Sequence, residues 1–143
     1  MKRLIMSAML LMVLAGCDKP DEKISEELAL MVEAPASTVD LKSLRAPPWE
    51  RICVIAPCAT HDDIEQRIGF KWDGLSKSSI GGNDGIYLLT FISNNQVVAY
   101  VEHPRNKGDF LELQPVCLVR ENSVLHKKRD KSGWVQLLSN EQP

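Results

Sequence analysis

The side chains of this sequence best suited to acid–base chemistry near neutral pH are three histidines, His61, His103 and His126. A histidine that activates a nucleophile needs a serine or a cysteine within hydrogen-bond reach. The chain has no Gly-x-Ser-x-Gly motif, no two histidines share a motif spacing, and Cys58 is too near His61 along the chain to form such a pair. We therefore expect solvated surface histidines and no catalytic residue.

Two carboxylates and a glycine-rich segment are the next candidates for chemistry. Asp73 and Asp84 could flank a glycan, as the paired acids of glycoside hydrolases do. Residues 81–85 read Gly-Gly-Asn-Asp-Gly, which lacks the Gly-Lys-Ser/Thr ending of a phosphate-binding loop and precedes an expected strand. A turn is the better interpretation of this segment.

The most specific motif lies in the first seventeen residues. Two basic residues precede an apolar run over residues 4–14, which is too short to span a bilayer because a spanning helix needs about 20 apolar residues. The following Leu14-Ala15-Gly16-Cys17 resembles the lipobox of bacterial lipoproteins. The resemblance implies that signal peptidase II removes residues 1–16, and that Cys17 carries a diacylglycerol and an N-acyl chain.

Asp18 follows the predicted lipid-bearing cysteine. In enteric bacteria an aspartate at this place is typical of lipoproteins kept in the inner membrane, so the resemblance implies a domain that faces the periplasm from that membrane. The chain has a formal net charge of −2, and the loss of Lys2 and Arg3 with the signal peptide would take it to −4. This mildly acidic balance offers no general footprint for nucleic acid, and we expect no cofactor besides the covalent lipid.

Three cysteines remain once Cys17 is assigned to lipid, and an oxidising compartment would let two of them pair. Cys53 and Cys117 each lie in an apolar, strand-like run, so we favour a Cys53–Cys117 disulfide, with Cys58–Cys117 as the alternative. The favoured bond would stabilise the fold by about 2–4 kcal/mol. Cys53 and Cys58 do not have the spacing of a redox Cys-x-x-Cys motif, and the further ligands of a zinc site are missing nearby, so we expect no metal.

Residues 17–48 are expected to form the lipidated end and a flexible tether. Residues 18–23 are too charged to pack a core, and residues 34–48 contain three prolines. Between them, residues 25–33 place apolar side chains at helical spacing. A helix this short is marginal alone in water, so it either docks on the domain or stays dynamic. We expect one globular domain over residues 49–140.

A helix and a hairpin are the clearest elements of this domain. The spacing predicts a helix over residues 61–68, with Thr60 as its N-cap and Gly69 as its C-terminal residue. Residues 86–93 and 96–103 are rich in β-branched and aromatic side chains and flank Asn94-Asn95, which predicts a tight hairpin. Both strands are more apolar than a half-exposed pair needs, so we place them at the centre of a sheet.

The remaining strands complete an α+β domain. We expect a buried strand over residues 51–57, a strand bent at Pro115, and a weaker hairpin near the end of the chain; the last two comprise residues 109–113 with 116–120, and residues 124–127 with 133–138. The predicted fold is a small, mostly antiparallel sheet of four to six strands with one short helix packed on it.

The order of a strand, a short capped helix ending in Ile68-Gly69, an aromatic residue and a strong hairpin resembles small lipoproteins of the outer-membrane-assembly (SmpA/OmlA) type. It also resembles the inhibitor-like α+β modules related to them. The match covers residues 61–102, and Phe70-Lys71 stands where that family tends to have a proline. The resemblance implies a fold, and no functional residue is carried over from it.

Trp72 and Arg105 are the predicted recognition residues, since tryptophan and arginine dominate the binding energy of protein interfaces. Our leading hypothesis is a lipid-anchored periplasmic protein without catalytic activity. It would bind another protein, as an accessory of envelope assembly or as an immunity protein or inhibitor. The alternative is an envelope enzyme that acts on cell-wall glycan or peptide through Asp73, Asp84 or a histidine.

Overall fold

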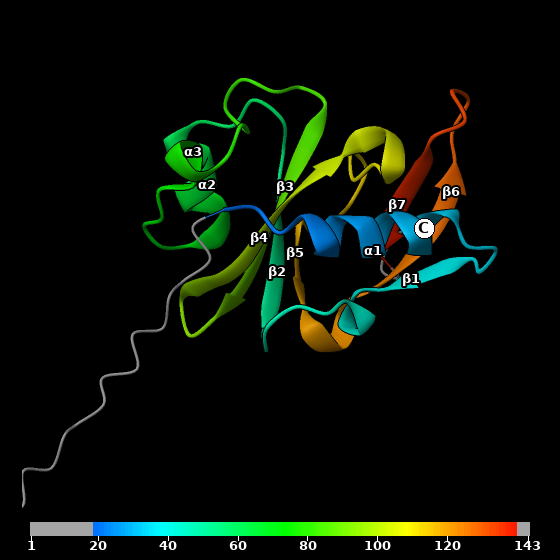
Figure 1. The fold of residues 1–143 in the computed structure, drawn as a ribbon, viewed down its shortest axis with the longest axis horizontal. Coiled ribbons are helices and arrows are strands. Elements are labelled where there is room, and N and C mark those ends of the chain that lie inside the picture. Colours follow the sequence, from blue (N-terminus) through cyan, green and yellow to red (C-terminus); the bar gives the residue numbers. More distant parts are fainter. Residues whose placement is uncertain (1–18, 140–143) are drawn as a thin grey trace, which may run out of the picture.

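Residues 19–139 are described by the computed structural model, which contains three α-helices and two antiparallel sheets in this range (Figure 1). One sheet has four strands and the other has three. The predicted α+β class is confirmed, but the prediction of a single sheet with one helix is wrong. The difference arises because the last hairpin of the chain pairs with a strand at residues 38–40 and does not join the first sheet.

The four-stranded sheet is built around the predicted hairpin. The two residues of its turn, Asn94 and Asn95, have positive φ angles of 50° and 53°, which asparagine tolerates. The hairpin is therefore confirmed, although its second strand forms an edge of the sheet and is not central. In order across the sheet, the strands are β4 (Gln96–Pro104), β3 (Ile86–Ser93), β2 (Arg51–Ile55) and β5 (Cys117–Val119).

Helices cover both faces of this sheet, which explains why its strands are apolar at nearly every position. On one face lies α2 (His61–Ile68), followed by the short α3 (Gly74–Lys77). The predicted helix over residues 61–68 is confirmed: Thr60 caps its N-terminus in a capping box, and Gly69 ends it at a φ of 88°. Ile64 and Ile68 bury the apolar side of α2 against the sheet.

Helix α1 (Glu22–Glu33) packs on the opposite face, within the segment that we expected to be a tether. Ile24, Leu28 and Val32 form one stripe along α1 and are 1%, 0% and 6% exposed. They belong to the same buried cluster as the inward side chains of β3. The prediction of a flexible tether up to residue 48 is corrected here, because the apolar stripe of this segment supplies part of the core.

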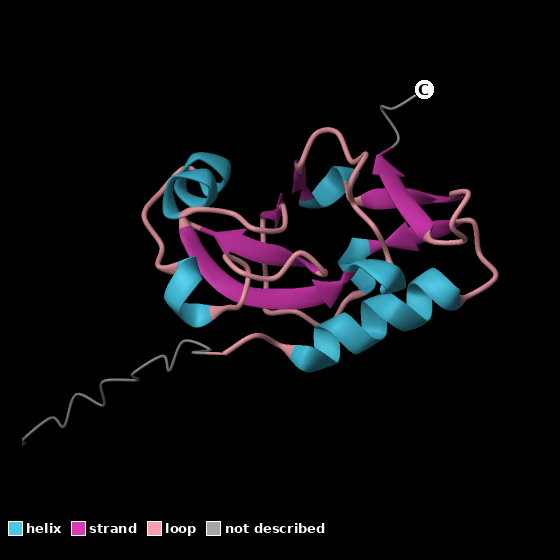
Figure 2. Cartoon of the chain, turned by 90° about the horizontal axis from the view of Figure 1, so that it is seen from above, coloured by secondary structure: helices cyan, strands magenta, loops and turns pink. Residues whose placement is uncertain are grey.

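The three-stranded sheet combines a strand that comes directly after α1 with the last hairpin of the chain. After α1 the chain forms β1 (Thr38–Asp40), which pairs with β6 (Val124–Arg129), and β6 pairs with β7 (Val135–Ser139). The predicted final hairpin is thus confirmed. Residues 109–113, expected to be a strand, form a turn from which Asp109 makes a bridge to Gln136 of β7. Seen from above, α2 and α3 lie at one end of the molecule, with β6 and β7 at the other (Figure 2).

Candidate functional site

Arg105 and Asp109 lie on either side of a chain reversal that follows β4. The reversal uses Gly108, whose φ is +140°, and a Cβ at this position would come within 3.1 Å of His103 Nε2 and of a methyl group of Val32. Any other residue at position 108 would therefore be both strained and crowded. This glycine and the 3₁₀ turn η2 (Arg105–Lys107) bring Arg105 Nη2 to 3.2 Å from Asp109 Oδ2.

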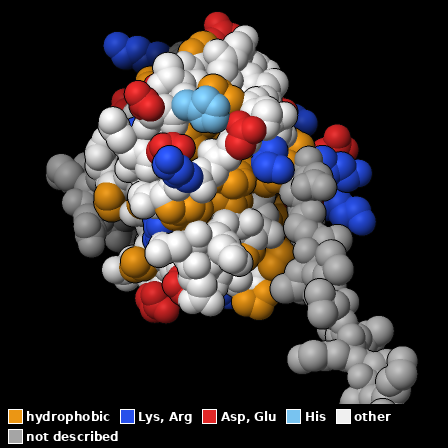
Figure 3. All heavy atoms as spheres, turned by 90° about the vertical axis from the view of Figure 1, so that its left-hand side faces the viewer, with side chains coloured by type: hydrophobic (Ala, Val, Ile, Leu, Met, Phe, Trp, Pro, Cys, Tyr) orange, Lys and Arg blue, Asp and Glu red, His pale blue; other side chains and the backbone are white. Residues whose placement is uncertain are grey.

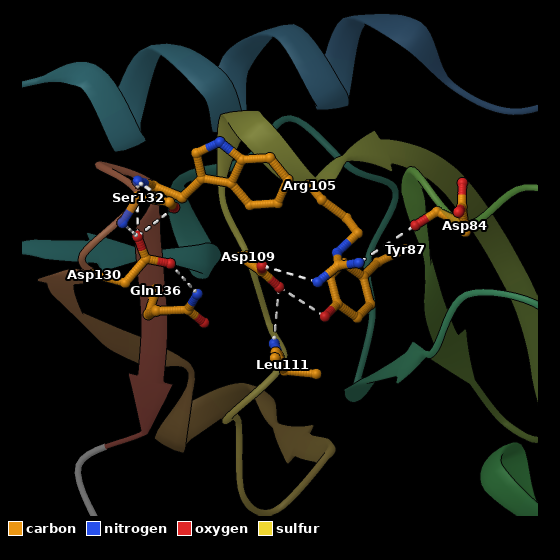
Figure 4. A network of polar contacts seen from close by, with 9 residues as sticks. Asp84, Tyr87, Arg105, Asp109, Leu111, Asp130, Ser132 and Gln136 are labelled. Atoms are coloured by element: carbon orange, nitrogen blue, oxygen red, sulfur yellow. Dashed lines mark hydrogen bonds and ion pairs between the residues drawn. The ribbon is translucent and has the colours of Figure 1, made fainter.

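Asp109 is 1% exposed, and its carboxylate accepts three hydrogen bonds (Figure 4). The hydroxyl of Tyr87 donates at 2.7 Å, the backbone N–H of Leu111 at 3.0 Å, and the guanidinium of Arg105 at 3.2 Å. A buried carboxylate needs such partners because an isolated charge is costly to desolvate. Burial of Tyr87, together with its bond to Asp109, raises the pKa of the phenol well above its ordinary value.

The backbone of Asp109 joins this network to the second sheet. Its N–H donates to the carbonyl of Val135 at 2.9 Å, and its carbonyl accepts from the N–H of Leu137 at 2.8 Å. Its side chain meanwhile binds Tyr87 of β3. Asp109 therefore connects the two sheets, with its backbone bonded to β7 and its side chain bonded to β3. Because Asp109 also binds Arg105, it fixes the guanidinium relative to both sheets.

The guanidinium of Arg105 lies between two aromatic rings. It is 5.7 Å from the ring centre of Tyr87 and 5.6 Å from that of Trp134, within the range of cation–π attraction. Trp134 is 37% exposed, and Leu111, whose amide binds the same carboxylate, is 66% exposed. We call Arg105, Leu111 and Trp134 the Arg105 surface: Arg105 binds the buried acid through its guanidinium, Leu111 through its backbone amide, and Trp134 packs on Arg105.

Asp130 holds Trp134 in place from the turn between β6 and β7. Its carboxylate accepts from the backbone N–H groups of Ser132 at 2.8 Å and Trp134 at 3.1 Å, and from the side-chain amide of Gln136 at 3.0 Å. The hydroxyl of Ser132 also donates to this carboxylate. The pKa of Asp130 is lowered by these hydrogen bonds, of which the one from the Ser132 hydroxyl has the largest effect. The turn that presents Trp134 is thus ordered by its own side chains (Figure 4).

The two predicted recognition residues, Trp72 and Arg105, lie on opposite faces of the four-stranded sheet. Trp72 packs edge-on against Tyr100 at 5.2 Å and lies, partly buried, against the cluster of α2 and α3. Arg105 packs on Tyr87, which belongs to the cluster on the other face. The tryptophan beside Arg105 is Trp134, and the prediction of Trp72 in this place is wrong. The spacing of four residues between Arg105 and Asp109 was the available signal for the ion pair, but nothing local indicates Trp134.

Of the acids and histidines considered for catalysis, Asp73 and His61 lie together, whereas Asp84 and His103 belong to other networks. Asp73 caps α3 and lies 3.5 Å from His61 Nε2, with both side chains more than half exposed. The bond from Ser76 to Asp73 lowers the pKa of this carboxylate. Asp84 contributes its backbone carbonyl, which accepts from Arg105 at 3.4 Å. The structure thus gives Asp73 a capping role and places Asp84 in another network.

His103, expected on the surface, is fully buried at the end of β4, and it links α1 to η2. Its Nε2 lies 3.0 Å from the carbonyl of Lys107, which can only accept, so Nε2 carries the proton. Its Nδ1 then accepts from the hydroxyl of Ser25 at 3.1 Å. Burial, followed by the nearby charge of Lys107, lowers the pKa of His103 to about 4. The neutral imidazole is therefore part of the contact that holds α1.

This environment predicts a loss of stability in mild acid. Because the pKa of His103 is about 4 in the folded chain and near 6.5 in the unfolded chain, the unfolded state binds more protons between these values. The contribution of His103 to the free energy of unfolding should be fully present above pH 6.5. It should fall as the pH drops towards 4, by about 2 kcal/mol between pH 7 and pH 5. Urea unfolding at the two pH values measures this, with His103→Gln as the non-titrating control. Equal losses in both proteins would contradict the prediction.

The predicted Cys53–Cys117 disulfide is confirmed and joins β2 to β5. Cys58 is free and exposed, so the alternative pairing of Cys58 with Cys117 is wrong. Among residues 19–139, no group of three or more His, Cys, Asp or Glu side chains is placed to hold a metal ion. No helix in this range is long and apolar enough to cross a bilayer. Cys17 and Asp18 lie outside the described residues, so the lipid anchor and the sorting signal stay predictions.

Comparison with known proteins adds no relative to this picture. No protein-family model, curated protein or solved structure matches the chain. The resemblance to SmpA/OmlA-type lipoproteins therefore stays a prediction. The function has to be inferred from the geometry of the chain itself.

Proposed function

We propose that this chain is a lipid-anchored protein of the bacterial cell envelope that binds another protein through the Arg105 surface. The observation that carries the proposal is the exposure of Trp134 beside an arginine fixed by a buried carboxylate, with the exposed Leu111 bonded through its backbone to the same carboxylate. Large apolar side chains left in water next to an arginine are typical of interface centres. The partner is expected to place an apolar or aromatic side chain against Trp134.

The order of the surface favours binding. Asp109 holds the guanidinium of Arg105, and this guanidinium packs on the ring of Trp134, whose backbone is held by Asp130, so both side chains have contacts within the chain before a partner binds. Side chains that are ordered before association lose less conformational entropy when they bind, by about 0.5–1.5 kcal/mol each. The Arg105 surface is therefore better suited to a small interface than a flexible loop is, because a loop would lose more conformational entropy on binding.

The lipobox-like Leu14-Ala15-Gly16-Cys17 supports the anchor, and Asp18 favours the inner membrane if the source is an enteric bacterium. The Cys53–Cys117 disulfide agrees with an oxidising compartment such as the periplasm. An anchor would keep the domain at high effective concentration beside membrane-bound partners. Either an envelope-assembly complex or an enzyme that the chain inhibits fits this arrangement.

Site-specific photo-crosslinking in cells tests the proposal, with a photoreactive amino acid in place of Leu111. Leu30 on α1 is the matched control, because it is an equally exposed leucine, at 67% against 66%, outside the Arg105 surface. We expect a covalent adduct of defined mass from position 111 and none from position 30. Adding Trp134→Ala should abolish the adduct, since the ring forms part of the same surface. No adduct from position 111, or equal adducts from both positions, would contradict the proposal.

A further inference from the structure

The first described residues of the chain lie beside α3. Lys19 to Glu22 line a cleft of about 590 Å³ whose opposite wall is formed by Ser76 to Ser79 and Glu102. The N–H of Asp21 donates to the carbonyl of Tyr100 at 2.8 Å, and the Asp21 carboxylate caps α1. The chain is therefore held against the domain from Asp21 onward, at the end that carries α2 and α3 (Figure 1).

This placement limits how far the domain can lie from Cys17. Asp18 alone separates Cys17 from Lys19, so the Cα atoms of these two residues lie at most about 7 Å apart even when the chain is fully extended. An acylated Cys17 would have its chains in the hydrocarbon and its backbone at the headgroups. Because α1 is packed into the core, no long tether lies between the anchor and the domain. The α3 end must then sit close to the headgroup layer.

The surface at this end has the composition of a membrane contact. Phe70, Trp72 and Leu75 pack on the edge of the second core cluster and are each only partly buried. Figure 3 views this end of the molecule and shows hydrophobic side chains gathered between charged ones. Tryptophan is enriched at the level of lipid headgroups, where its ring meets both apolar and polar surroundings. We call these three residues the α2–α3 surface.

The charges around the cleft indicate an apolar rather than an electrostatic contact. Two basic residues, Lys19 and Lys77, are outnumbered by three acidic ones among its lining residues, Asp21, Glu22 and Glu102. Attraction to an anionic bilayer requires an excess of basic residues, each contributing about 1 kcal/mol near the surface. The contact should therefore depend on aromatic burial, and not on the proportion of anionic lipid.

We infer that the α2–α3 surface lies against the bilayer when Cys17 carries lipid, an inference that rests on the proposed anchor. The occupant of this surface is then the headgroup layer of the membrane that holds the chain. Since β6 and β7 lie at the other end of the molecule, the turn between them, which carries Trp134, lies away from the membrane (Figures 1 and 2). One end is held at the lipid, and the Arg105 surface is left free for a partner.

Tryptophan quenching in the lipidated full-length protein tests the orientation. The protein is reconstituted in phosphatidylethanolamine–phosphatidylglycerol vesicles that contain a spin-labelled phospholipid. Trp49 is 4% exposed and gives a constant background. We expect Trp134→Phe to keep the lipid-dependent quenching and Trp72→Phe to lose it. Quenching lost in Trp134→Phe but kept in Trp72→Phe would reverse the orientation and overturn the inference, as would an absence of quenching in both.

Hydrogen exchange provides a second readout that needs no variant. Amides of residues 70–78 should become protected on vesicles, while those of the β6–β7 turn, residues 130–133, should not; the opposite pattern would overturn the inference. Flotation of the same sample with vesicles separates the two proposals. If the chain floats but residues 70–78 are not protected, the orientation fails and the anchor stands. If the chain purified from cells does not float, both fail.

Discussion

Leu28→Ala is expected to lower the free energy of unfolding by about 2–5 kcal/mol, the range for a leucine truncated in a packed core. Leu28 is 0% exposed and lies in the middle of the apolar stripe of α1, within the larger buried cluster. The truncation removes apolar contacts and leaves a cavity in the buried cluster beneath α1. Chemical denaturation of the two proteins measures the difference.

The matched control lies on the same helix. Leu30 is 67% exposed, so Leu30→Ala should change the free energy of unfolding by no more than about 0.5 kcal/mol. Both variants replace leucine with a good helix former, so helix propensity cancels between them. Equal, small effects of the two variants would mean that α1 is not docked. That result would restore the flexible tether and remove the basis for the membrane orientation.

The pattern of α1 was visible in the sequence, but its docking was not. Leu28 and Val32 have helical spacing, yet a charged lead and a proline-containing segment surround them, and such surroundings are typical of a linker. The contacts that dock α1 on the four-stranded sheet come from β4, more than sixty residues further along the chain. Local patterns cannot report a contact of that separation.

Elements with local signals were predicted well. The hairpin depends on Asn94-Asn95, and α2 depends on Thr60 and Gly69, so the residues that determine each element lie within or beside it. The Cys53–Cys117 pair was also predictable, because both residues lie in apolar runs that became adjacent strands. In contrast, β1 is three residues long and is defined only by its pairing with β6.

The candidate site was predicted only in part. Arg105 was singled out from the sequence, but its partner there was expected to be Trp72. In the structure the partner of Arg105 is Trp134. The chain turns at Gly108, and the backbone of Asp109 then bonds to β7, which brings Arg105 next to Trp134. His103 was expected to be solvated, and its burial depends on α1, whose docking the sequence had left open. Both errors follow from contacts between segments distant in sequence.

The second large effect concerns Cys17, on which the location, the orientation and the access to partners all depend. A single acyl chain holds a protein to a bilayer only marginally, whereas two or more give stable anchoring, with about 0.8 kcal/mol for each buried methylene. Cys17→Ser removes the acceptor of the lipid. We expect this variant to retain residues 1–16 and to carry no lipid, while residues 19–139 fold unchanged. Cys58→Ser is the matched control, because it removes the free, exposed thiol and should leave lipidation unaffected.

Mass spectrometry of the intact protein purified from membranes tests the proposed anchor most directly. The expected mass is that of a chain that begins at Cys17 and carries a diacylglycerol and one further acyl chain. Cys17→Ser should instead give the mass of the complete, unmodified sequence from Met1. A wild-type chain recovered in the soluble fraction with an unmodified Cys17 would contradict the lipid anchor and the membrane orientation inferred from it.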